Sequence, residues 1–170
     1  KIFFKRWSPE MAYTLGFFAA DGTMIEGKRG NYYVEFTSCD REILEQIKDI
    51  MGANHTITGR KRNKRWKTCY RLQIGSKILF GDLRKLGFRP NKSKCLFWPK
   101  IPASYLRDFI RGYFDGDGHV TTGWYRRYNR KNMSHVLFAG FTSGTKKFLL
   151  ILKKEQAKIK TIDDYNKFVN

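Results

Sequence analysis

Residues 110–118 read Ile-Arg-Gly-Tyr-Phe-Asp-Gly-Asp-Gly, an apolar stretch with helical character that ends in Asp-Gly. A related stretch occurs earlier, where residues 15–22 read Leu-Gly-Phe-Phe-Ala-Ala-Asp-Gly. Asp-Gly after a single helix is ordinary turn chemistry. Two copies in one chain indicate two related halves, each of which brings one carboxylate, Asp21 or Asp117, to a shared seam. Such an arrangement is typical of a metal-dependent site built from two carboxylates.

Small residues recur four positions apart in both stretches. Gly16 and Ala20 lie on one face of the first helix, and Gly112 and Gly116 lie on one face of the second. A glycine inside a helix costs about 1 kcal/mol relative to alanine, so these glycines need a packing reason. We expect the two helices to pack on each other through these faces. The opposite apolar stripes are expected to face the rest of each half: Met11, Leu15, Phe18, Leu106, Ile110 and Phe114.

Start and stop signals delimit the two helices. Ser8-Pro9-Glu10 predicts a capped start for the first helix, and Ser104 is expected to cap the second. Both helices are expected to end at the glycine that follows the aspartate. The two carboxylates then lie at helix C-termini, where the helix dipole disfavours negative charge and a bound cation would offset that cost. The alternative is that each aspartate only forms a turn.

At this point the chain resembles a known family. Residues 110–118 resemble the nonapeptide of the LAGLIDADG homing endonucleases, and residues 14–22 resemble a more divergent copy. The segments that follow also resemble each other, since 33–38 read YVEFTS and 138–143 read FAGFTS. Matching residues are 96 positions apart in the motifs and 105 apart in these segments. Nine extra residues are therefore expected in the turn-rich run 124–134.

The resemblance covers most of the chain and implies an α+β fold. It implies two pseudo-symmetric αββαββα halves, whose antiparallel sheets form a DNA-binding saddle. We expect an N-terminal half at 1–88, a linker at 89–103 and a C-terminal half at 104–170. The second half is expected to be shortened and incomplete, because the counterpart of Leu86 would fall beyond the last residue.

The charge of the chain points to a polyanionic partner. It has 34 Lys and Arg against 15 Asp and Glu, a net charge of +19, so nucleic acid is the first candidate. A hydrophobic content of 41% is enough for a packed core, which distinguishes the chain from a disordered basic tail. A ribosomal-type protein or a generic basic surface is the alternative. No apolar run approaches the roughly 20 residues of a membrane helix, so no membrane partner is expected.

The cysteines are few and far apart. Cys39, Cys69 and Cys95 are an odd number with wide spacing, which predicts neither a disulfide framework nor a zinc site. The N-terminus lacks the features of a secretion signal. We therefore expect an intracellular protein that is found with its target genome, in the cytoplasm or nucleoid or in an organelle matrix.

The resemblance also implies the roles of individual residues. Asp21 and Asp117 would bind Mg²⁺ or Mn²⁺, with more than one ion at the shared site, and the carbonyls of Ala20 and Gly116 would help. The family places a lysine near each site, and the candidates here are Lys92 and Lys94. Strand alternation and the implied saddle predict DNA contacts from a set of basic and amide side chains: Arg60, Arg62, Lys64, Arg65, Lys67, Arg71, Gln73, Arg126, Arg127, Arg130 and Lys131.

These observations predict a monomeric, site-specific endonuclease that hydrolyses both strands of a long duplex DNA target. Two other classes stay open. One is a maturase that binds its host intron RNA and assists splicing, and the other is a catalytically silent DNA-binding protein on the same fold. The presence of both Asp21 and Asp117 favours the nuclease over the silent protein.

Overall fold

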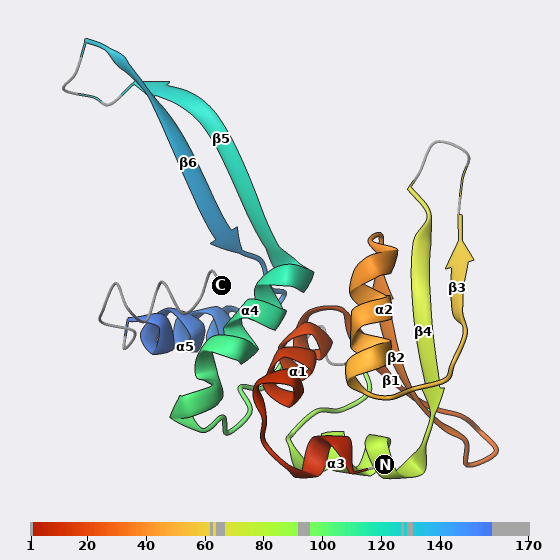
Figure 1. Ribbon diagram of the computed structural model, residues 1–170. Helices are drawn as coiled ribbons and strands as arrows, with labels where there is room; N and C mark the ends of the chain where they lie inside the picture. Colours follow the sequence, from red (N-terminus) through yellow and green to blue (C-terminus); the bar gives the residue numbers. More distant parts are fainter. Residues whose placement is uncertain are drawn as a thin grey trace.

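Two helices form the centre of the molecule, and each leads directly into a β-hairpin (Figure 1). They are α1 (Pro9–Asp21) and α4 (Leu106–Asp117), which lie side by side. The hairpin strands are β1 (Gly22–Glu26) and β2 (Tyr32–Ser38), then β5 (Gly118–Arg126) and β6 (Met133–Phe141). The computed structural model describes residues 2–61, 63, 67–91, 96–126, 128 and 131–157. The predicted α+β fold with antiparallel sheets is confirmed.

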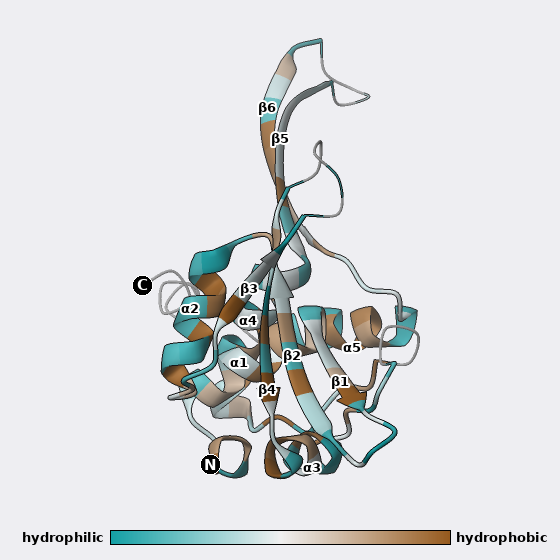
Figure 2. Ribbon diagram, turned by 90° about the vertical axis from the view of Figure 1, so that its right-hand side faces the viewer, coloured by the Kyte–Doolittle hydropathy of each residue, from teal (hydrophilic) through white to brown (hydrophobic). Residues whose placement is uncertain are grey.

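The first half has the complete predicted order of elements. Its four antiparallel strands are arranged as β1-β2-β4-β3. The remaining elements of this half are η1 (Phe3–Lys5), α2 (Arg41–Ile50), β3 (Ile57–Arg60), β4 (Cys69–Gly75) and α3 (Lys77–Lys85). Figure 2 shows the strands of this sheet in front of α1, α4 and α5 (Lys146–Gln156).

The sheet of the first half has one buried and one outward face. Val34, Phe36, Leu72 and Ile74 are buried, and they share one core with the apolar side chains of α2 and α3. The alternate side chains of β2 and β4, which include Glu35 and the predicted DNA contacts Arg71 and Gln73, therefore lie on the other face.

The hairpin of the second half is longer than that of the first. β5 and β6 pair at nine positions, from Gly118 opposite Phe141 to Arg126 opposite Met133, whereas β1 and β2 pair at five. The four additional pairs account for eight of the nine extra residues, so most of the insertion lies in strands. The prediction that it lies in a loop over 124–134 was wrong to that extent. The paired strands extend away from the rest of the molecule in both views (Figures 1 and 2).

Part of the expected linker belongs to the core of the second half. The Trp98 ring lies 5.5 Å from the ring of Phe109 and 5.1 Å from that of Phe148. Leu96 is also buried, and its N–H donates to Thr145 Oγ1 at 3.1 Å. Residues 158–170 lie outside the described residues, so the shortened second half stays a prediction.

The helix starts differ between the two halves. The Ser8 hydroxyl accepts a hydrogen bond from the Met11 N–H at 3.1 Å, so the predicted cap of α1 is confirmed. The expectation that Ser104 caps α4 was wrong, because Ser104 lies within the 3₁₀ turn η3 (Ala103–Tyr105). α4 begins after Tyr105 without a side-chain cap, since this 3₁₀ turn leads straight into the helix.

The two central helices touch backbone to backbone. A Cβ atom added to Gly16 would lie 2.0 Å from the Phe109 carbonyl oxygen, and one added to Gly112 would lie 2.0 Å from that of Tyr13. Gly116 packs on the methyl group of Ala20 in the same way. Any side chain larger than hydrogen at Gly16 or Gly112 would push the helices apart.

In the described residues, no helix is long and apolar enough to cross a membrane.

This contact predicts a large effect for the smallest substitution. Gly112→Ala is expected to destabilise the protein by roughly 3 kcal/mol or more, because the added methyl group meets backbone that cannot rotate away. Gly81→Ala in α3 is the matched control, since nothing lies within 4 Å of its added methyl group. That variant is expected to be neutral or stabilised by up to about 1 kcal/mol. Urea unfolding measures both, and equal stability of the two variants would contradict the packing described.

Candidate metal centre and nucleic-acid interface

The C-terminal ends of α1 and α4 meet at one cavity. Its volume is about 270 Å³, and its lining includes Asp21 and Asp117, the last residues of the two helices. The other residues that line it are Ala19, Ala20, Leu96, Ser143 and Gly144. The repeated motif therefore brings one carboxylate from each half to the same cavity.

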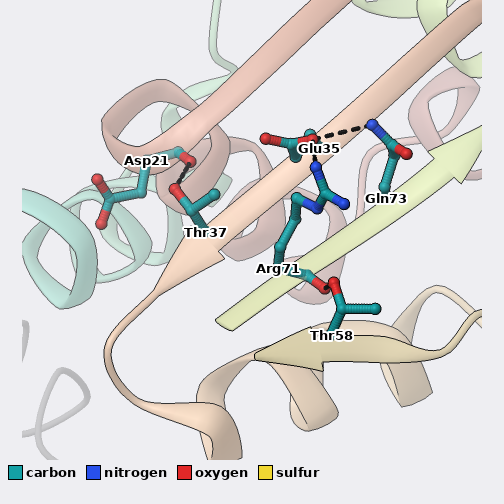
Figure 3. Close-up of polar contacts among 6 residues, drawn as sticks. All are labelled: Asp21, Glu35, Thr37, Thr58, Arg71 and Gln73. Carbon is teal, nitrogen blue, oxygen red and sulfur yellow. Dashed lines mark hydrogen bonds and ion pairs between the residues drawn. The ribbon is translucent and has the colours of Figure 1, made fainter. Parts of the chain in front are cut away.

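The backbone carbonyl of each aspartate is held by the strand that returns to it. The Thr37 hydroxyl donates to the carbonyl oxygen of Asp21 at 3.1 Å (Figure 3). In the second half, the Thr142 N–H donates to the carbonyl oxygen of Asp117 at 3.0 Å. Thr37 and Thr142 occupy matching places in the two halves, but one uses its side chain and the other its backbone. Both contacts fix the helix end from which the carboxylate projects.

Tyr113 supports the part of the cavity that the second half of the chain contributes. Its ring is fully buried against Phe141 and Phe148, and its hydroxyl donates to the Thr142 carbonyl oxygen at 2.7 Å. Burial raises the pKa of the Tyr113 phenol, and the nearby negative charges of Asp117 and Asp21 raise it further. The same phenol therefore lies close enough to both carboxylates for each of them to raise its pKa.

Asp115 lies outside this cavity although it belongs to the same motif. Its carboxylate accepts a hydrogen bond from the Tyr13 hydroxyl at 2.8 Å. The Arg111 guanidinium lies over the Tyr13 ring, 4.9 Å from its centroid. These groups line a second cavity of about 360 Å³ with Glu10 and Gln46. Asp115 thus provides a natural comparison for the two aspartates of the first cavity.

The first cavity has the donor chemistry of a site for a hard divalent cation. Its two carboxylates lie at helix C-termini, where an uncompensated negative charge is unfavourable. Gly116 is adjacent, since a Cβ atom there would lie 3.7 Å from Asp21 Oδ2. Within the described ranges, no group of three or more His, Cys, Asp or Glu side chains gathers around one point. Mg²⁺ is commonly held by one or two carboxylates together with water and substrate phosphate, and this donor set fits that pattern.

A polar network occupies the outward face of the first sheet. Gln73 Nε2 donates to Glu35 Oε2 at 3.0 Å, and Arg71 Nη1 lies 3.6 Å from the same oxygen (Figure 3). The Arg71 side chain is 50% exposed, whereas that of Glu35 is 13% exposed. Glu35 therefore orients two side chains that keep further donors for a partner. Glu35 is not among the residues predicted from the sequence, although its pairing with Gln73 follows from the strand register.

The predicted DNA contacts fall into three groups. The exposed ones in the described residues are Arg60, Lys67, Arg71, Arg126 and Lys131. Gln73 is half-buried against Glu35. The others lie outside the described residues, as do the lysines expected near the active site: Arg62, Lys64, Arg65, Arg127, Arg130, Lys92 and Lys94.

The fold of the chain is shared with solved homing endonucleases. The I-LtrWI LAGLIDADG homing endonuclease, solved bound to target DNA, aligns with a TM-score of 0.55 over 86% of this chain and 71% of its own, at 15% identity. I-DmoI, solved in complex with DNA and Mn, aligns with a TM-score of 0.51 over 89% of this chain and 78% of its own, at 16% identity.

The sequence comparisons identify a family domain in the first half of the chain. Residues 8–86 match the family described as a LAGLIDADG-like domain. An uncharacterized protein of Methanocaldococcus jannaschii is 31% identical over 122 residues, which are 68% of this chain and 41% of that protein. The chain spans less than half the length of the curated relatives that it matches. Residues 8–86 are therefore a LAGLIDADG-like domain, and the chain has the fold of the solved LAGLIDADG homing endonucleases.

The buried phenol predicts a specific loss of stability at alkaline pH. The pKa of Tyr113 is raised in the folded state, so its contribution is complete below its ordinary pKa of 10.0 and is lost as the pH rises above it. There, one such tyrosine costs about 1.4 kcal/mol of unfolding free energy per pH unit. In Tyr113→Phe the unfolding free energy should fall by about 1.4 kcal/mol less per pH unit above pH 10 than in the wild type. Urea unfolding on both sides of pH 10 measures this difference. An unchanged slope would contradict the described environment of Tyr113.

Proposed function

We propose that the protein is a site-specific DNA endonuclease that hydrolyses both strands of a long duplex target in a divalent-metal-dependent reaction. The observation that carries this proposal is the single cavity lined by Asp21 and Asp117, one from each repeated motif. The DNA bound to I-LtrWI, and the DNA and Mn bound to I-DmoI, support it. Because one chain supplies both carboxylates, we propose that it acts as a monomer.

In this proposal the carboxylates of Asp21 and Asp117 hold Mg²⁺ or Mn²⁺, and the carbonyls of Ala20 and Gly116 are further donors. A divalent cation held there would supply positive charge next to the phosphodiester and would lower the pKa of a nearby water. Thr37 and Thr142 keep the two helix ends in place through the carbonyls of the aspartates. Lys92 and Lys94 are proposed to contact the scissile phosphate or the attacking water.

DNA binding is proposed along the outward face of the first sheet and the β5–β6 hairpin. The net charge of +19 supplies the attraction to phosphate, which needs no particular base sequence. Sequence preference requires side chains held against base edges. Arg71 and Gln73 suit this task because the Glu35 carboxylate contacts both of them in the absence of a partner. A side chain already oriented loses less conformational entropy on binding.

The central test is cleavage of a randomised duplex library with Mg²⁺. Asp21→Asn and Asp117→Asn should each lower double-strand cleavage by at least about 10²- to 10³-fold, the scale expected when one group that stabilises the transition state is removed. Asp115→Asn is the matched control, since that carboxylate binds Tyr13 outside the cavity. This variant should keep the cleavage activity of the wild type.

Each alternative class has its own outcome in this experiment. Sequence-specific binding without any cleavage by the wild type would indicate the silent DNA-binding protein. Salt-sensitive binding to structured RNA, without cleavage of duplex DNA, would indicate the maturase. Equal activity of all three asparagine variants would contradict the role proposed for the cavity.

The oriented arginine gives a second prediction. Arg71→Ala should weaken binding to the selected target by about 1–3 kcal/mol and relax the preference at one or two base pairs. Lys85→Ala is the matched control, because it removes the same charge from an exposed position at the end of α3, which packs on the core side of the sheet. Electrophoretic mobility shifts at several salt concentrations separate the two variants. Equal weakening by both would show that only net charge matters and that Arg71 reads no base.

A further inference from the structure

Two cysteines that are far apart in the sequence meet at the sheet of the first half. The Sγ atoms of Cys39 and Cys69 lie 3.3 Å apart, although 30 positions separate the residues in the chain. Both are free thiols, and both side chains are exposed. The hydrogen bond between them raises the pKa of the Cys39 thiol. The third cysteine, Cys95, lies outside the described residues.

The strand register explains why the two thiols meet. β2 and β4 run antiparallel, and Ser38 is paired with Tyr70 at the end of the ladder. Cys39 follows Ser38 and Cys69 precedes Tyr70, so the cysteines are directly opposite one another in the continued register. Side chains opposite each other on antiparallel strands have Cβ atoms about 4.5–5.5 Å apart. A disulfide bond needs a Cβ separation of roughly 3.5–4.5 Å, so only a small adjustment at the strand end is required.

We propose that Cys39 and Cys69 are a modification site at which a reversible disulfide bond forms between the two strands. The oxidant is a low-molecular-weight disulfide such as glutathione disulfide. One protein thiolate attacks the oxidant, forms a mixed disulfide and releases one thiolate. The second protein thiolate then attacks the mixed disulfide at the protein sulfur and releases the second. The two protein thiols lose two protons and two electrons, and the oxidant is reduced to two thiols. The exposure of both sulfurs gives the oxidant access.

The bond would brace the sheet next to the first cavity. Cys39 is two residues from Thr37, which holds the carbonyl of Asp21. Cys69 begins β4 and is paired on its other side with Arg60 of β3. A covalent link here ties β2 to β4 at the end of the sheet nearest to Asp21. This inference does not depend on the proposed nuclease activity, because it concerns only the thiols and the strand pairing.

Peptide mapping of the full chain tests the proposal directly. The reduced protein is incubated with glutathione disulfide, alkylated with iodoacetamide and digested with trypsin without reduction. The expected product is residues 30–41, which contain Cys39, linked to residues 68–71, which contain Cys69. Dithiothreitol should release both peptides. Cys95→Ser should give the same linked product, whereas Cys39→Ser should not.

A stability measurement checks the bond by a second route. Oxidation should raise the Tm of the wild type, since a closed loop restricts the unfolded chain, and Cys69→Ser should show no such rise. Three results would overturn the proposal. They are separate glutathionylation of Cys39 and Cys69, a link from either of them to Cys95, and two thiols that stay alkylatable throughout.

Discussion

The contact between the backbones of α1 and α4 is the constraint on which the rest of the structure depends. Gly16 and Gly112 are placed so that each glycine faces a carbonyl oxygen of the opposite helix. No side chain separates the helices there, so their C-terminal ends converge on one cavity and bring Asp21 and Asp117 with them. Each hairpin begins at the residue that directly follows the aspartate, at Gly22 in the first half and Gly118 in the second. Their positions are therefore set by the same contact, and so is the cavity that the proposed chemistry requires.

The two halves solve the same structural problem with different groups. In one half a threonine hydroxyl binds the aspartate carbonyl, and in the other a threonine N–H does so. The buried phenol of Tyr113 supports only the second half, where the first half has Phe17 at the matching position. Pseudo-symmetry thus extends to the fold and to the carboxylates but not to the atoms that support them. Two such sites need not have equal environments even when they use the same acid.

The sequence was informative where local chemistry decides the structure. The Ser8 cap, the four-residue spacing of small residues and the strand alternation around Leu72 each express one short-range rule, and the structure follows them. The predicted cap at Ser104 was wrong because a 3₁₀ turn leads straight into α4, and no single residue signals such a turn. Glu35 and the thiol pair were not found because they depend on register. Register joins residues that are distant in the chain, and it becomes readable only when the strand partners are known.

The extension of the β5–β6 hairpin has a consequence for how such an arm changes in length. Eight of the nine additional residues lie in pairs, four to each strand. At about 3.4 Å per residue, four residues lengthen the arm by about 14 Å. Because side chains alternate with a period of two, an even number per strand leaves the tip facing the same way as in the shorter hairpin. An arm that grows in such steps reaches further along a surface without reversing which of its side chains point toward it.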